Sequence, residues 1–286
     1  GPVIVPENAE WEHVTFIHQD AAGSYWYGTV ENGLYYYNPA FGKMIRYHAS
    51  GYTSEEFSDN GAWRAFTSRD GILWIGTAQG NLFRINPLQT KIPHYAVPGS
   101  SANSFYEEPD GTFWIGTNHG LIRQDKSGEN SEQILIDRNP ASPDNDIYVI
   151  HSNKKGKMWV GGAGGLSGWD KKNERFIRYK NEPENNSSLS NNNVYAIFED
   201  RESNLWIGTA SGLNRMNQET GIVKRYNTSL FVTSVYEDNS DNFWIGTWNG
   251  QGIFLFNKET GEFKNYLSGA NVICLFEDHE NVIWAG

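Results

Sequence analysis

Cysteine is almost absent from this sequence of 286 residues, and Cys274 is its single copy. One cysteine cannot form an intrachain disulfide, and it leaves no cysteine-rich zinc site and no CxxC redox pair. Positive charge is also scarce, because 23 Lys and Arg stand against 34 Asp and Glu and give a formal net charge of -11. That balance disfavours binding to nucleic acid or to an anionic membrane surface, both of which require basic residues.

Long hydrophobic segments are missing as well. No run of 18 apolar residues occurs, so we expect no membrane insertion by this segment, and no signal peptide is visible. No stretch shows convincing helical periodicity over 11 residues. By contrast, glycine is abundant at 30 residues and aromatic residues make up 14% of the chain. Many glycines together with many aromatic residues are typical of a protein built from strands and turns.

A repeat organises nearly the whole chain. A Trp followed by an apolar residue and then Gly recurs at intervals of 38 to 48 residues, and the third residue after the Trp is usually Thr. The six complete copies and the start of a seventh are centred on Trp26, Trp74, Trp114, Trp159, Trp206, Trp244 and Trp284. An apolar residue lies twelve and nine positions before each Trp, and an acid lies six positions before five of them. A period of this length indicates a repeat architecture.

Each repeat is predicted to contain four short strands. In the fifth repeat these are residues 194–199, 205–209, 213–217 and 222–226, separated by segments rich in Asp, Asn, Ser and Gly. Such segments supply turn geometry, and the alternation of polar and apolar residues between them fits the two-residue period of a strand. Four antiparallel strands repeated every 40 to 50 residues are typical of a β-propeller.

The predicted fold is therefore all-β, a seven-bladed β-propeller of four-stranded antiparallel blades that forms a single domain over residues 1–286. The seventh repeat has only two strands, so we expect its blade to be incomplete or to be completed by the N-terminal strand Val3-Ile4-Val5. Gly1-Pro2 is typical of the scar left by a tag-cleaving protease, and we expect the chain to be a fragment of a larger protein.

The recurring residues are predicted to be structural. A Trp in every blade suits packing between neighbouring sheets, where it buries a large apolar area. The Gly allows the adjacent blade to approach closely, and the Thr is expected to form a hydrogen bond within its blade. A role needed seven times is rarely catalytic, and we apply the same interpretation to the recurrent acids.

Functional residues are instead expected where the repeat varies, on the innermost strands and on the loops of one face. The variable positions lie in three columns of the repeat, thirteen, eleven and ten positions before the Trp, and in the loop that follows the Gly-Thr. Aromatic rings with amide, acid and Arg groups suit a polar organic ligand such as a sugar. The candidate ligand-binding residues are Trp63, Arg64, Tyr148, Tyr195, Asn193, His119, Trp248 and Asp146. Trp248 also begins an insertion over residues 248–252, which is either a recognition loop or a longer turn.

Signs of catalysis, of a metal site and of a cofactor are missing from the sequence. It contains no HExxH motif, no Gly-x-Ser-x-Gly elbow and no phosphate-binding loop, so the prediction is no catalytic residues, no metal and no cofactor. His18 and His151 occupy a column that holds Phe or Tyr in the other repeats. We expect them to replace packing aromatic residues rather than to bind a metal.

Residues 188–200, SLSNNNVYAIFED, continued by residues 204–215, NLWIGTASGLNR, closely resemble the two-component regulator propeller repeat. The resemblance covers nearly the whole chain, strongly in the fifth and sixth repeats and loosely in the fourth, where Gly162 replaces the Thr. This family builds the extracytoplasmic sensor regions of hybrid histidine kinases, especially in Bacteroidetes. The resemblance implies a periplasmic propeller that senses glycan breakdown products. Its implied partners are an adjacent propeller or β-sandwich domain of the parent chain, and a homodimer is a further candidate assembly.

The function predicted from these observations is non-catalytic ligand sensing for a two-component signalling protein, with an oligosaccharide as the ligand. Two alternatives stay open at this point. One is a propeller glycosidase or lyase that uses acids facing the channel, such as Asp146, and the other is a pure protein-interaction scaffold. Stoichiometric binding without turnover would favour sensing, and product formation would favour the enzyme.

Overall fold

The protein is an all-β propeller in the computed structural model, which describes residues 13–20, 22–40, 42–47, 61–69, 71–85, 94–96, 101–125 and 130–286. Its strands form six four-stranded antiparallel sheets, numbered here as blades 1 to 6 in chain order, and one two-stranded sheet. Each blade is an up-and-down meander in which consecutive strands pair. The described residues also contain one short 3₁₀ helix, η1 (Pro143–Asn145). The predicted fold class is confirmed.

The chain divides into two compact units. Unit 1 consists of Gly1–Asn103 with Phe276–Gly286, and unit 2 consists of Ser104–Leu275. Unit 1 holds blade 1, with β1 (Val14–Gln19), β2 (Tyr25–Thr29), β3 (Leu34–Asn38) and β4 (Lys43–Tyr47), and blade 2, with β5 (Ala62–Thr67), β6 (Leu73–Thr77), β7 (Asn81–Ile85) and β8 (His94–Ala96).

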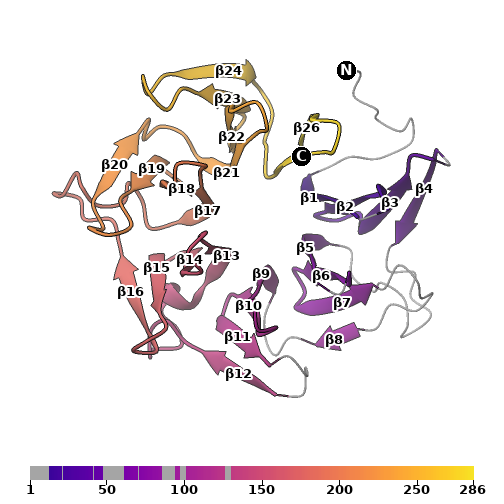
Figure 1. The fold of residues 1–286 in the computed structure, drawn as a ribbon, viewed down its shortest axis with the longest axis horizontal. Helices are drawn as coiled ribbons and strands as arrows, with labels where there is room; N and C mark the ends of the chain where they lie inside the picture. Colours follow the sequence, from indigo (N-terminus) through magenta and orange to yellow (C-terminus); the bar gives the residue numbers. More distant parts are fainter. Residues whose placement is uncertain are drawn as a thin grey trace. The chain divides into compact units, whose positions relative to one another are not determined.

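Unit 2 contains three whole blades and most of another. Blade 3 has β9 (Ala102–Glu107), which begins at the boundary between the units, β10 (Phe113–Thr117), β11 (Gly120–Gln124) and β12 (Ser131–Ile134). Blade 4 has β13 (Ile147–Ser152), β14 (Met158–Gly162), β15 (Gly165–Asp170) and β16 (Arg175–Tyr179). Blade 5 has β17 (Val194–Glu199), β18 (Leu205–Thr209), β19 (Gly212–Met216) and β20 (Val223–Tyr226). Blade 6 has β21 (Val232–Glu237), β22 (Phe243–Thr247), β23 (Ile253–Phe256) and β24 (Phe263–Leu267). The first strands β13, β17 and β21 lie side by side (Figure 1).

The predicted number of seven blades is corrected to six. The seventh repeat contributes only β25 (Leu275–Glu277) and β26 (Ile283–Ala285), because the sequence stops one residue after β26. Among the described residues the last blade has two strands. Its proposed completion by residues 3–5 lies outside the described residues. Within unit 1 this strand pair packs on blade 1, where the Tyr25 hydroxyl donates to Asp278 Oδ2 at 3.2 Å and the Tyr25 and Trp284 rings lie 5.7 Å apart.

The repeated Trp is buried in four repeats and partly exposed in the other three. Trp114, Trp159 and Trp206 are fully buried, as predicted. The indole N–H donates to the acid at 2.7–3.1 Å in five repeats, which are Trp26 to Asp20, Trp114 to Glu108, Trp206 to Asp200, Trp244 to Asp238 and Trp284 to Asp278. In the fourth repeat Asn153 replaces the acid, and Trp159 donates instead to Gln218 at 3.2 Å. The recurrent acids therefore satisfy buried indole donors.

The Thr and Gly after the Trp also have the predicted structural roles. The Thr209 hydroxyl donates to the Gly212 carbonyl oxygen at 3.0 Å and accepts from the Ser211 N–H at 3.2 Å, so it closes the loop between the second and third strands. The Gly permits close approach of the next blade. A Cβ added at Gly208 would lie 2.6 Å from Val232 Cγ1 and 3.1 Å from Ala196 Cβ.

The variant Gly208→Ala is expected to destabilise the protein by about 1–3 kcal/mol, because the new methyl group overpacks the contact between blades 5 and 6. Urea unfolding measures the change, and a double-mutant cycle with Val232→Ala is the control. If Val232 is the group that the new methyl contacts, the loss of unfolding free energy in the double variant is at least about 0.5 kcal/mol smaller than the sum of the losses in the two single variants. Strict additivity would contradict this interpretation.

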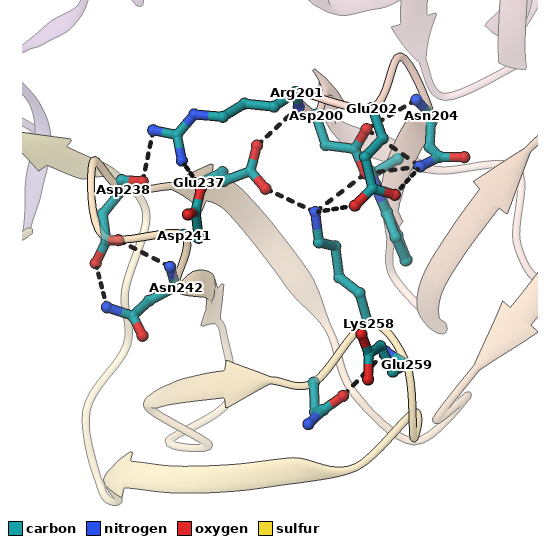
Figure 2. Close-up of polar contacts among 12 residues, drawn as sticks. Asp200, Arg201, Glu202, Asn204, Glu237, Asp238, Asp241, Asn242, Lys258 and Glu259 are labelled. Carbon is teal, nitrogen blue, oxygen red and sulfur yellow. Dashed lines mark hydrogen bonds and ion pairs between the residues drawn. The ribbon is translucent and has the colours of Figure 1, made fainter.

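Charged side chains join blades 5 and 6 near the ends of their first strands (Figure 2). Lys258 Nζ lies 2.6 Å from Glu237 Oε1, 3.5 Å from Asp200 Oδ2 and 3.7 Å from Glu202 Oε1. Arg201 donates through its guanidinium to the Asp238 carbonyl oxygen at 2.7 Å and through its N–H to Glu237 at 2.8 Å. Lys258 comes from the loop between β23 and β24, so one cation holds acids of two blades. We call Asp200, Glu202, Glu237 and Lys258 the lysine latch.

Candidate functional site

The column eleven residues before the Trp coincides with a β-bulge. The pairing of the first and second strands shifts register in blades 1, 2, 4, 5 and 6, which leaves one extra residue on the first strand of each. Those residues are Thr15, Trp63, Tyr148, Tyr195 and Thr233. A bulge bends its strand and redirects the side chain at that position. The column chosen for its variability therefore coincides with the bulged position of the first strand.

The two threonines in this column are satisfied by the neighbouring strand. The Thr15 hydroxyl donates to the Ala62 carbonyl oxygen, and the Thr233 hydroxyl donates to the Val272 carbonyl oxygen. In both cases the acceptor is the first residue of the next repeat. At these bulges the side chain joins one repeat to the next, whereas the aromatic residues at the same position behave differently.

Three aromatic rings form a continuous row in unit 2. The rings of Tyr148 and Tyr195 are stacked, with centroids 5.2 Å apart and an interplanar angle of 17°. The Tyr195 ring lies 4.8 Å from that of Phe231, which directly precedes β21. All three residues are partly exposed. We call Tyr148, Tyr195 and Phe231 the aromatic row. Because the rings stack on one another, the row offers a ligand mainly its edges and tyrosine hydroxyls.

Asp146 lies at one end of the aromatic row. It ends η1, and its Oδ2 accepts a hydrogen bond from the Tyr148 hydroxyl at 3.0 Å. Burial raises the pKa of the Asp146 carboxyl, against the opposing effects of the Tyr148 hydrogen bond and of His119. Burial and then the Asp146 charge raise the pKa of both Tyr148 and Tyr195, so both tyrosines stay protonated donors at neutral pH.

The fourth repeat departs from the pattern at the point where it meets Asp146. A Cβ added at Gly162, which replaces the usual Thr, would lie 1.8 Å from the Asp146 carbonyl oxygen. A Cβ at Gly164 would lie 2.2 Å from Asp144 Oδ1. The segment containing η1 thus fits against blade 4 only because these two residues have no side chain. The loose match of the fourth repeat was a sequence signal for this part of the site.

The other candidates in unit 2 have separate surroundings. His119 is exposed in the loop between β10 and β11, where its carbonyl oxygen accepts from Gln133 Nε2 at 2.7 Å. Asn193 is partly exposed, and its carbonyl oxygen accepts from the Ala210 N–H at 3.0 Å. Of the predicted residues, the structure brings Asp146, Tyr148 and Tyr195 into direct contact, and His119 acts on Asp146 electrostatically.

The insertion that begins at Trp248 is bonded to the end of the aromatic row. The Trp248 N–H donates to the Phe231 carbonyl oxygen at 2.9 Å, and Gln251 Oε1 accepts from the Phe231 N–H at 3.0 Å. Gln251 also donates to the Ser229 carbonyl oxygen at 2.9 Å. The insertion therefore positions Phe231. Phe231 itself was missing from the predicted site, although it shares the column thirteen before the Trp with Asp146 and Asn193.

Trp63 and Arg64 belong to unit 1. Trp63 is partly exposed, and its indole Nε1 is buried with no hydrogen-bond partner among the described residues. Arg64 donates to the carbonyl oxygens of Thr15 at 3.0 Å and Trp63 at 2.9 Å, so its guanidinium supports the bulges of β1 and β5. An unpaired buried donor is costly and suits a site where a ligand or water supplies the acceptor.

The two histidines in the aromatic column are partly buried. His18 Nε2 lies 2.7 Å from the Thr67 hydroxyl. Burial lowers the pKa of His18 and of His151, against the opposing charges of Asp20 and Glu199 respectively. Across the described ranges, no group of three or more His, Cys, Asp or Glu side chains could hold a metal ion. Nor do those ranges contain a helix with the length and hydrophobicity that crossing a bilayer requires.

Comparison with known proteins identifies the repeat. Residues 96–119, 188–211 and 227–249 match the family model described as "Two component regulator propeller", which confirms the resemblance found in the sequence. No curated protein matches the chain. The extracellular domain of a protein assigned to the hybrid two component systems of B. thetaiotaomicron superposes with a TM-score of 0.82 at 21% identity, covering 96% of this chain. This chain spans 38% of the length of that domain.

Two lyases share the propeller fold at lower similarity. A catalytically inactive virginiamycin B lyase from Staphylococcus aureus, solved with quinupristin, has a TM-score of 0.72 at 15% identity and covers 96% of this chain and 91% of its own. A streptogramin B lyase has a TM-score of 0.71 at 13% identity and covers 95% of this chain and 89% of its own. At these identities the likeness concerns the fold alone.

Proposed function

We propose that this chain, whose repeats are two component regulator propeller repeats, is a non-catalytic ligand-sensing propeller of a two-component signalling protein. It works in the periplasm and binds an oligosaccharide or glycan breakdown product. The observation that carries the proposal is the aromatic row, where bulges in β13 and β17 place Tyr148 and Tyr195 beside Phe231 and Asp146.

The chemistry of this group of residues suits a carbohydrate. Sugar hydroxyls need both donors and acceptors, and the Asp146 carboxylate and the tyrosine hydroxyls supply them. Sugar C–H groups also pack against apolar ring surface, and the three rings of the row are partly exposed. The indole donor of Trp63 in unit 1 suits the same class of ligand.

A ligand on the row would act on the contacts between blades. The row runs over blades 4 and 5 to the start of blade 6, so one ligand can touch residues of three blades. A ligand shifts a conformational equilibrium only through different affinities for the two states. Sensing then requires that the spacing of these blades, or their packing against an adjacent propeller, β-sandwich domain or second copy, differ between the free and bound forms.

An enzyme is the second candidate function. Burial raises the pKa of Asp146, as a general acid requires, and two lyases share the fold. A glycosidase usually needs a second carboxylate across the scissile bond, whereas among the described residues the side-chain hydrogen bond of Asp146 is with the Tyr148 hydroxyl. Sensing is therefore the better supported proposal, and recovery of intact ligand after prolonged incubation separates the two.

Tyr195→Ala is expected to weaken oligosaccharide binding at least about tenfold, because it removes the central ring of the row and one hydroxyl. Isothermal titration calorimetry with the oligosaccharides that raise the melting temperature measures the effect. The control is Tyr266→Ala, since Tyr266 is 52% exposed on the outer strand β24. Equal losses in both variants, or none in Tyr195→Ala, would contradict the assignment of the site.

Trp63→Ala and Trp248→Ala belong to the same titration series. Both are expected to weaken binding without unfolding the protein, because neither residue is part of the buried core. Unchanged binding in both variants would show that the residues or the face were chosen wrongly.

A further inference from the structure

Two acids in one segment of unit 2 differ in how their charges are compensated. Asp144, with 2% of its side chain exposed, is paired with Arg178 at 2.7 Å and with Lys180 at 2.6 Å. Asp146 lies two residues further on. Among the described residues, its carboxylate accepts a hydrogen bond only from the neutral Tyr148 hydroxyl. No Lys or Arg from those residues forms an ion pair with Asp146. The charge of Asp144 is thus compensated by two cations of the fold, whereas no Lys or Arg of the described residues compensates that of Asp146.

The surroundings of Asp146 suit a cation. The carboxylate is partly buried beside the stacked rings of Tyr148 and Tyr195. A partly buried carboxylate without a Lys or Arg partner is a favourable site for an ammonium group, because charge-assisted hydrogen bonds are roughly twice as strong as neutral ones. The His119 imidazole, in an exposed loop, lowers the pKa of the Asp146 carboxyl electrostatically, against the larger effect of burial.

We propose that the ligand bound at the aromatic row carries a protonated amino group, as in an oligosaccharide of deacetylated amino sugars, and that its ammonium binds Asp146 beside Tyr148 and Tyr195. The inference rests on the proposed function, because it assigns the ligand class of the same site. The ammonium donates hydrogen bonds to the carboxylate, and the sugar hydroxyls bond to the tyrosine hydroxyls. The net charge of -11 attracts such a ligand and repels uronic acid chains.

The test compares three probes of equal length in calorimetric titrations at roughly pH 6, where a sugar amine is protonated. The probes are glucosamine oligomers, N-acetylglucosamine oligomers and galacturonic acid oligomers. We expect glucosamine oligomers to bind at least about tenfold more tightly than the acetylated ones, a difference of about 1.4 kcal/mol. Galacturonic acid oligomers should bind most weakly. This preference should decrease as salt is added, since it is electrostatic.

The variant Asp146→Asn should lose the tenfold preference while still binding the acetylated oligomer. Asp241→Asn is the matched control, because it removes one negative charge from a side chain that is 79% exposed. If Asp146→Asn does not fold, Tyr148→Phe replaces it in the test. That change frees the carboxylate from its hydroxyl donor, so the preference for glucosamine oligomers should increase, and an unchanged preference would overturn the inference.

Each outcome decides between the two proposals. Equal or tighter binding of the acetylated or uronic acid probe overturns the inference and leaves the sensing function standing. A glucosamine preference that survives in Asp146→Asn also overturns it. Failure of all three probes, together with failure of every neutral oligosaccharide in a wider panel, contradicts the proposed function itself.

Discussion

Replacing Trp206 by alanine is expected to lower the free energy of unfolding by about 3–5 kcal/mol. Trp206 is fully buried and lies against Tyr226 of its own blade and against Phe243 and Phe256 of blade 6, with ring centroids 4.9–5.6 Å apart. The substitution leaves a cavity between two blades. It also removes the hydrogen bond that the Trp206 indole N–H donates to Asp200 Oδ2 at 2.8 Å.

Urea unfolding followed by far-UV circular dichroism measures this loss. Trp248→Ala is the control, because it deletes the same ring from a partly exposed loop and should cost less than about 1 kcal/mol. A loss below about 1 kcal/mol in Trp206→Ala would contradict the account in which the repeated Trp joins neighbouring blades.

The second large effect is expected at the lysine latch. Lys258→Met should lower the free energy of unfolding at neutral pH by about 3 kcal/mol, since it leaves buried carboxylates without their cation. The side chains of Asp200 and Glu237 are 0% and 3% exposed, and that of Lys258 is 19% exposed. Lys264→Met is the control, because Lys264 is exposed on the outer strand β24 and contacts the ring of Tyr266.

The latch also predicts how stability depends on pH. Burial favours a higher pKa for Asp200, but hydrogen bonds from Trp206 and Asn204 and the Lys258 charge outweigh it and hold the pKa below the usual 3.8. Asp200 therefore stabilises the fold above about pH 3.8, and this stability is lost as the pH falls through the lowered pKa. Burial favours a lower pKa for Lys258, but Glu237 and Asp200 hold it above the usual 10.5, so its contribution persists until the pH rises through that raised value.

The deficit of Lys258→Met should consequently shrink as the pH falls through the lowered pKa of Asp200, because the protonated Asp200 no longer needs a cation. Unfolding curves of the two proteins at neutral pH and at about pH 3 check this. A deficit that stays constant with pH, or one no larger than that of Lys264→Met, would show that the latch carries little of the stability.

Much of the fold follows from the repeat. In the fifth repeat, strands predicted at 194–199 and 205–209 are observed with the same bounds as β17 and β18. The third was predicted one residue late, because β19 begins at Gly212, which has a φ of 108° and turns the chain into the strand. Local turn residues and apolar alternation determine these elements, so a single sequence suffices to locate them.

The features that could not be predicted depend on pairing between strands. The bulge at Tyr195 is a property of the register between β17 and β18, which spacing along the chain does not reveal. Lys258 meets Asp200 only because their blades are neighbours. Phe231 was visible in the right column, but its contact with Tyr195 depends on the backbone bonds of the insertion after Trp248.

The binding of an intact oligosaccharide is the most direct test of the central claim. The protein would be screened by thermal shift against plant and host oligosaccharides, and each hit would be recovered and weighed by mass spectrometry. A specific ligand raises the melting temperature by mass action. The account predicts one class of hits, recovered uncleaved, whose shift is lost in Tyr195→Ala but kept in Tyr266→Ala. Hits recovered as cleaved products would contradict it in favour of an enzyme, and a shift that Tyr195→Ala retains would contradict the site.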